Sequence, residues 1–114
     1  MKIWVDDIQP APDITYLVCK GVNETINAIV DFERVYGTKE HPKFVEPVGH
    51  YDITLLDLDY DAGDCAKDGG DYIKILEWLE ETNRNYPIRI HSQNPIGVEN
   101  MRKIIKKNGW EEVR

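Results

Sequence analysis

The chain has 114 residues, enough for one domain with a hydrophobic core, and its 21 acidic residues outnumber 14 Lys and Arg residues, for a net charge of −7. A protein this acidic is not expected to carry a broad nucleic-acid-binding surface, because such surfaces neutralise phosphates with clustered Lys and Arg. The sequence contains no apolar run of about 18 residues that would span a membrane. Its two cysteines, Cys19 and Cys65, form no disulfide or zinc pattern. We therefore expect a single domain over residues 1–114, in a reducing, cytoplasmic setting.

Short apolar runs predict the strands. The first is expected over residues 2–5, a weaker one over 15–19, and two more over 52–58 and 87–92. A final short strand is expected over residues 110–113.

Segments of helical period alternate with these strands. They cover residues 22–37, 70–83 and 97–109, and each has an apolar stripe. Asn23 is expected to cap the first helix. Strands that alternate with helices form right-handed crossover units. We therefore expect an α/β fold of the flavodoxin-like type, a three-layer parallel sheet with helices on both faces.

Polar residues follow three of the predicted strands. Asp6 and Asp7 come after the first, the segment DLDYDAGD at residues 57–64 follows the third, and His91 ends the fourth. Open parallel sheets bind ligands beyond the carboxyl ends of their strands, so these residues are expected to share one site. Converging carboxylates recruit a cation, and oxygen ligands suit Mg²⁺, Mn²⁺ or Ca²⁺ better than zinc. The pattern predicts a Mg²⁺ or Mn²⁺ site at Asp6, Asp7 and Asp59.

The aspartates also fit a calcium-loop pattern in part. Four of them occupy positions one, three, five and twelve of that pattern: Asp57, Asp59, Asp61 and Asp68. A calcium loop needs Gly at its sixth position, where this chain has Ala62, and a helix before it, where this chain has strand-forming residues. The pattern therefore disfavours a calcium hand.

His91 has two interpretations. It is either a structural histidine beneath the next helix or a general acid or base that works near neutral pH. Pro95 marks the start of that helix, whose first free amides could receive a phosphate. Ser92 and Asn94 could add hydrogen-bond donors to the same phosphate.

Two other features are interpreted as having no part in the site. His41 and His50 lie in the one long loop, residues 37–51, and are expected to be structural or incidental. The basic run RKIIKK at residues 102–107 is interpreted as a solvated helix face, which its position near a helix C-terminus also favours.

Three segments resemble the cyclic-phosphate-processing receiver domains, a divergent branch of the response-regulator receiver fold. They are VDDIQPAP at residues 5–12, LDYDAG at 58–63 with GGDY at 69–72, and IHSQNPIGVENM at 90–101. The HS-x-NP-x-G-x-x-NM element, which includes Asn100, is the most specific of these. The resemblance covers nearly the whole chain. It implies a receiver-like fold whose acidic pocket recognises or processes a cyclic phosphate, such as a nucleotide or an RNA end.

The resemblance also implies roles for individual residues. The leading hypothesis is a metal-assisted cyclic phosphodiesterase or phosphoesterase, with Mg²⁺ or Mn²⁺ as cofactor. Its catalytic residues would be His91, Asp59, Asp61 and Asp7, its ligand-binding residues Ser92, Asn94, Asn100 and Tyr60, and its metal ligands Asp6, Asp7 and Asp59.

The chain departs from the family pattern in several places. Tyr60 stands where the family usually has His, and no basic residue lies near Gln9. Tyr60 could hydrogen-bond a phosphate oxygen, but its usual pKa of about 10 makes it a poor proton carrier near pH 7. The helix expected between the first two strands of a receiver is lost or shortened, and no Lys-Pro pair follows a fifth strand. A non-catalytic sensor of a phosphate-bearing ligand or partner is therefore the alternative, and a phosphoacceptor receiver is disfavoured.

Overall fold

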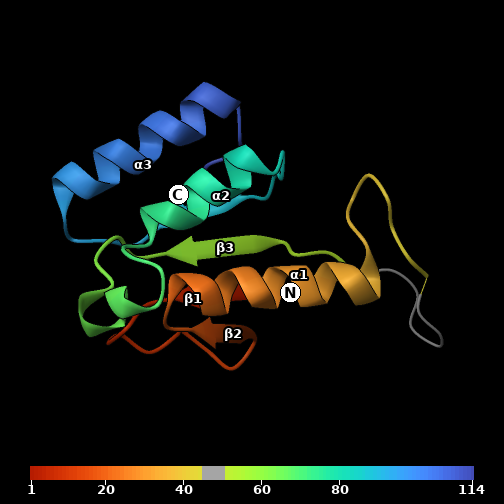
Figure 1. The fold of residues 1–114 in the computed structure, drawn as a ribbon, viewed down its shortest axis with the longest axis horizontal. Coiled ribbons are helices and arrows are strands. Elements are labelled where there is room, and N and C mark those ends of the chain that lie inside the picture. The colour runs from red at the N-terminus through yellow and green to blue at the C-terminus, as the bar shows by residue number, and fades with distance from the viewer. Residues whose placement is uncertain (45–50) are drawn as a thin grey trace.

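The structure is a computed structural model that describes residues 1–44 and 51–114, so His50 lies outside the described residues (Figure 1). It contains four strands, three α-helices and one short 3₁₀ helix. In chain order these are β1 Lys2–Val5, β2 Tyr16–Cys19, α1 Val22–Tyr36, β3 Leu55–Leu58, η1 Gly63–Lys67, α2 Ile73–Glu81, β4 Ile88–Ile90 and α3 Pro95–Asn108.

The four strands form one parallel sheet in the order β2-β1-β3-β4. This confirms the predicted α/β class of the receiver or flavodoxin-like type. The loop that joins β1 to β2 is described throughout and contains no helix, as expected for this chain. The predicted last strand is reduced to a single bridge, in which Glu112 lies beside Ile88 at the outer edge of β4.

The three α-helices pack on one face of the sheet. Their apolar side chains join one buried cluster with the strand residues Ile3, Val5, Leu56, Leu58 and Ile88. The connections from β2 to β3 and from β3 to β4 cross the sheet in the same direction, so right-handed crossovers place α1 and α2 on the same side. Helix α3 lies beside α2 (Figure 1). A second helical layer would need a helix between β1 and β2, so within the described residues the helices cover one face rather than both.

The opposite face of the sheet carries polar and aromatic side chains. Trp4, Asp57 and Arg89 are neighbours in register on β1, β3 and β4. Trp4 is buried although it lies outside the main apolar cluster. Its indole N–H donates to the main-chain oxygen of Gln9 at 2.9 Å. The loop after β1 is therefore held against this face.

Helix α1 begins differently from the prediction. Gly21, rather than Asn23, is the N-cap residue and supplies no side-chain cap. Asp68, far along the chain, accepts a hydrogen bond from the main-chain N–H of Glu24 at 3.0 Å. A Cβ atom at Gly21 would overlap the Asp68 side chain, so glycine permits this contact. Asp68 is thus a cap for α1 and is not placed as the last ligand of a calcium loop.

Candidate functional site

Three carboxylates converge at the carboxyl edge of the sheet, where β1 and β3 end side by side. Asp6 and Asp7 follow β1, and Asp59 follows β3, whose chain is held to β1 by the Asp59 N–H donating to Val5 at 3.0 Å. One ligand oxygen from each carboxylate lies within 4.8 Å of the others. Asp6 is almost fully buried, while Asp7 and Asp59 are partly exposed. The structure therefore brings together the three residues that the sequence predicted as metal ligands.

The carboxylate of Asp6 is fixed from two sides. The main-chain N–H groups of Ile8 and Gln9 donate to its Oδ1, each at 2.9 Å. Its Oδ2 lies 3.0 Å from Nε2 of His91. The turn after β1 and the end of β4 thus hold one aspartate in a defined orientation.

His91 is held at both ring nitrogens. Its Nδ1 lies 2.7 Å from Asp57 Oδ1, and its Nε2 faces Asp6. The ring stacks on Trp4, with centroids 3.7 Å apart and planes at 4°. Burial alone would lower the pKa of His91, but hydrogen bonds to Asp57 and Asp6 outweigh it and raise the pKa above the usual 6.5. When protonated, the ring donates to both carboxylates, and neither nitrogen is then free for a ligand.

Asp57 lies beneath the site instead of at its rim. It is a strand residue of β3 with 0% of its surface exposed. Its Oδ1 is hydrogen-bonded to Nδ1 of His91, and its Oδ2 lies 3.3 Å from the guanidinium of Arg89. Each of three strand residues lies two positions before a residue of the site: Asp57 before Asp59, Trp4 before Asp6, and Arg89 before His91. Side chains two apart in a strand share a face, so these three form a supporting layer.

Asp59 is a partly buried carboxylate whose charged form is disfavoured. Burial raises its pKa above the usual 3.8, and the nearby charge of Asp6 adds to the increase. Hydrogen bonds from the Tyr60 N–H, at 2.7 Å, and from Ser92 oppose the shift in part. Burial and the neighbouring carboxylate thus both disfavour the charged form of Asp59, and a bound cation would offset this effect.

The residues after His91 mainly build the start of α3. The side chain of Asn94 caps the helix by accepting from the N–H of Gly97 at 3.0 Å, and Pro95 is the first helical residue. The Asn94 amide also donates to Asp61 at 3.4 Å, so Asp61 is tied to α3 and is not a member of the carboxylate cluster. Ser92 Oγ accepts from the Asn94 N–H at 3.2 Å. Because the cap occupies the amide of Gly97, that amide is not a preformed phosphate contact.

Tyr60 packs against the backbone of α3. A Cβ atom at Gly97 would overlap the Tyr60 ring, so the glycine of the HS-x-NP-x-G element makes room for this contact. Asn100 lies one turn further along α3 and is partly exposed. Tyr60, Asn94 and Asp61 thus join the loop after β3 to α3. These contacts give them a structural role near the pocket.

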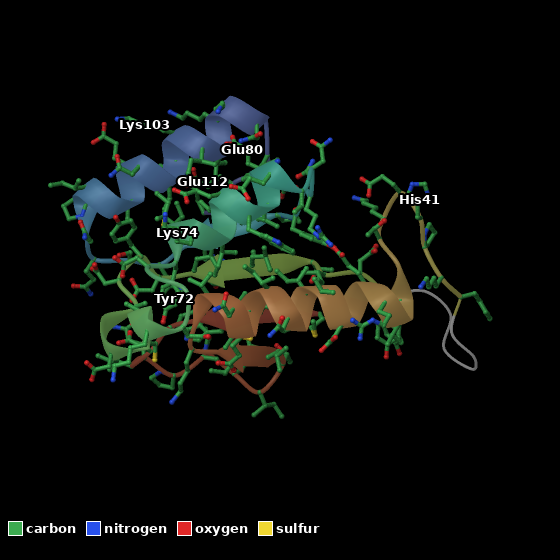
Figure 2. The ribbon with its side chains drawn as sticks, viewed as in Figure 1. His41, Tyr72, Lys74, Glu80, Lys103 and Glu112 are labelled. Carbon is green, nitrogen blue, oxygen red and sulfur yellow. The ribbon has the colours of Figure 1, made fainter. Side chains whose placement is uncertain are left out.

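The loop after β3 also approaches Asp7 closely. Gly63 has a φ of 54°, in the left-handed region that favours glycine, and a Cβ atom there would overlap Asp7 Oδ2. His41, by contrast, is exposed on the loop after α1, away from these strand ends (Figure 2). Glycine at position 63 therefore allows the start of η1 to lie against the side chain of Asp7.

The site fits a hard divalent cation by its donor chemistry. Its three potential ligands are all carboxylates, which Mg²⁺ and Mn²⁺ prefer. One of the three, Asp6, is already oriented by other groups, as is common for protein ligands of metals. The residues that would hold the ion are Asp6, Asp7 and Asp59.

The fold and the site define a parallel α/β domain with an acidic pocket at the carboxyl edge of its sheet. The model of one family, the cyclic-phosphate processing receiver domain, matches residues 1–107, and the chain belongs to this family. Neither the curated proteins nor the solved structures include a match to this chain. Among the described residues, no helix combines the length and apolar character needed to cross a membrane.

Proposed function

We propose that this receiver domain hydrolyses a cyclic phosphate ester with the help of a divalent cation bound by Asp6, Asp7 and Asp59. The supporting observation is the approach of three carboxylate oxygens to within 4.8 Å at the end of the sheet. A phosphate is an anion, and this cluster would repel it without a cation between them. Mg²⁺ or Mn²⁺ would polarise the phosphoryl oxygens and lower the pKa of a bound water.

In the proposed reaction, water adds to phosphorus, one ring P–O bond breaks, and the departing ring oxygen takes up the proton that the water loses, so that a linear phosphomonoester with a free hydroxyl forms. Asp6 serves as a preoriented ligand, because two amides and His91 fix its carboxylate. His91 is a positioning residue that also supplies positive charge close to the phosphate. Asp59 would help to hold the ion and would orient the attacking water. The Ser92 hydroxyl donates to Asp59 and would help to orient that carboxylate.

A second candidate is a non-catalytic sensor that binds a phosphate-bearing ligand. Two observations favour it. His91 has carboxylates at both nitrogens, and Tyr60, which replaces the family histidine, packs on Gly97. Among residues 1–44 and 51–114, the pocket then has no histidine that is free to act as general acid. Such a module would bind a cyclic phosphate and leave it intact.

The test is a ³¹P NMR time course with a nucleoside 2′,3′-cyclic phosphate and millimolar Mg²⁺, which is diamagnetic. Wild-type protein should convert the cyclic phosphate resonance into that of a monoester, and chelation of the metal should stop the conversion. Asp7→Asn combined with Asp59→Asn should abolish it. Asp64→Asn is the matched control, because Asp64 is exposed in η1 and lies outside the cluster. If the wild-type protein binds the cyclic phosphate but does not convert it, the hydrolase proposal is rejected in favour of the sensor.

A further inference from the structure

A groove runs along the outer side of α3, starting next to the acidic pocket. It is a shallow, open groove of about 700 Å³ between α3 and the end of β4. The residues that matter for its chemistry are Ser92 and Gln93 at one end, Val98 in the middle, and Arg102, Lys103 and Lys106 along the helix. Ser92 also interacts with Asp59 of the pocket. The groove and the pocket therefore meet at one residue.

The cations of the groove stand out from the rest of the protein. The whole chain has a net charge of −7, yet Arg102, Lys103 and Lys106 line one continuous groove. The Lys103 side chain is 70% exposed and extends from the outer side of α3 (Figure 2). Lys103 lies 4.0 Å from Glu99, and Arg102 donates through Nε to Glu112 at 2.8 Å. Three cations against two carboxylates still leave the groove positive.

The dimensions suit a single nucleic-acid strand. Helix α3 rises about 1.5 Å per residue, so the distance from Pro95 to Lys106 is about 16 Å. That is the length of up to about five nucleotides at a stacked spacing of 3.4 Å. An extended peptide would instead pair with the outer edge of β4. There Ile88 already bonds to Glu111 and Val113, which leaves too short an edge for an added strand.

We infer that this groove binds the phosphodiester chain of a single-stranded oligonucleotide whose cyclic phosphate end enters the acidic pocket. The inference rests on the proposed function, because it assigns the substrate as an oligonucleotide end rather than a free mononucleotide. Lys103, Lys106 and the remaining N–H groups of Arg102 contact backbone phosphates. The rest of the acidic surface repels the strand, which directs it along α3.

The probe is a fluorescein-labelled single-stranded hexaribonucleotide with a 2′,3′-cyclic phosphate end, and binding is followed by fluorescence anisotropy from 50 to 200 mM salt. The groove variant is Lys103→Glu with Lys106→Glu. The matched control is Lys39→Glu with Lys74→Glu, two exposed lysines outside the groove whose replacement changes the net charge equally. Loss of two phosphate contacts should weaken binding about tenfold at 50 mM salt and reduce the slope of log K against log salt by about 1.4.

The control variant should retain most of the wild-type affinity. Equal affinities for the wild type and the groove variant would overturn the inference, and so would equally strong competition by an acidic peptide. Turnover of a cyclic mononucleotide, measured in parallel, reports on the proposed function alone and should not differ between wild type and groove variant. If the cyclic mononucleotide is not turned over while hexaribonucleotide binding still depends on the groove, the proposed hydrolysis is rejected and the groove is retained. Mononucleotide turnover together with hexaribonucleotide binding that does not depend on the groove would reject the groove and leave the hydrolysis in place.

Discussion

Replacement of Asp57 by Asn tests whether the buried layer under the site holds His91 in place. Asp57 is fully buried. Its carboxylate oxygens lie 2.7 Å from Nδ1 of His91 and 3.3 Å from the guanidinium of Arg89. Asn has nearly the same shape, but it removes the negative charge and points an NH₂ group at one of two donors. The variant therefore leaves a buried imidazolium with Asp6 as its remaining carboxylate.

The expected cost follows from the geometry. Breaking a buried ion pair by removing one partner costs about 3–5 kcal/mol. Arg89 has 39% of its side chain exposed and can turn to water, so the lower end, about 3 kcal/mol, applies here. For a domain of this size that loss corresponds to a decrease in Tm of about 12 °C.

The assay is urea denaturation at pH 6, combined with an NMR titration of the His91 ring. Asp57→Asn should lower the free energy of unfolding without a change in the m value, and it should lower the pKa of His91 because its first hydrogen-bond acceptor is lost. Asp64→Asn should stay within about 0.5 kcal/mol of wild type. An equally small effect of Asp57→Asn, with an unchanged His91 pKa, would refute the supporting role of Asp57.

Three further predictions concern stability. Gly97→Ala should destabilise the fold by about 1–3 kcal/mol through overlap with Tyr60, and by less in a Tyr60→Ala background; a double-mutant cycle from urea denaturation that finds no coupling would contradict the contact. Asp68→Ala should cost about 0.5–2 kcal/mol by uncapping α1, and an unchanged Tm would show that the cap contributes nothing. Because the pKa of His91 is raised on folding, its contribution to stability should be complete below pH 6.5 and disappear as pH rises through the folded-state pKa, and His91→Gln should remove this slope in pH-dependent melts.

The sequence predicted the convergence of Asp6, Asp7 and Asp59 because strand ends are visible as apolar runs that stop at acidic residues. Once the strands are parallel neighbours, their carboxyl ends meet at one edge. The role of Asp57 could not be read in the same way. It follows the same apolar run as Asp59, and the choice between a rim position and a buried one depends on where the strand ends.

The support of His91 was also beyond the sequence, because it depends on register between strands that lie far apart in the chain. Trp4, Asp57 and Arg89 become neighbours only after β1, β3 and β4 have paired. A signal was nevertheless present, since each stands two residues before a predicted site residue and therefore shares its face. The prediction of Asn23 as the cap of α1 was wrong for a similar reason, because the capping side chain is Asp68, whose contact with α1 no local pattern encodes.

The central claim is that Asp6, Asp7 and Asp59 together hold one divalent cation, and isothermal titration with Mn²⁺ tests it most directly. Wild-type protein should bind one Mn²⁺ per chain, and Mg²⁺ should compete for the same site. Asp59→Asn should weaken the binding by at least tenfold, whereas Asp64→Asn, which removes a carboxylate from the neighbouring η1, should bind as wild type does. Equal Mn²⁺ affinity for wild type and Asp59→Asn would contradict the claim.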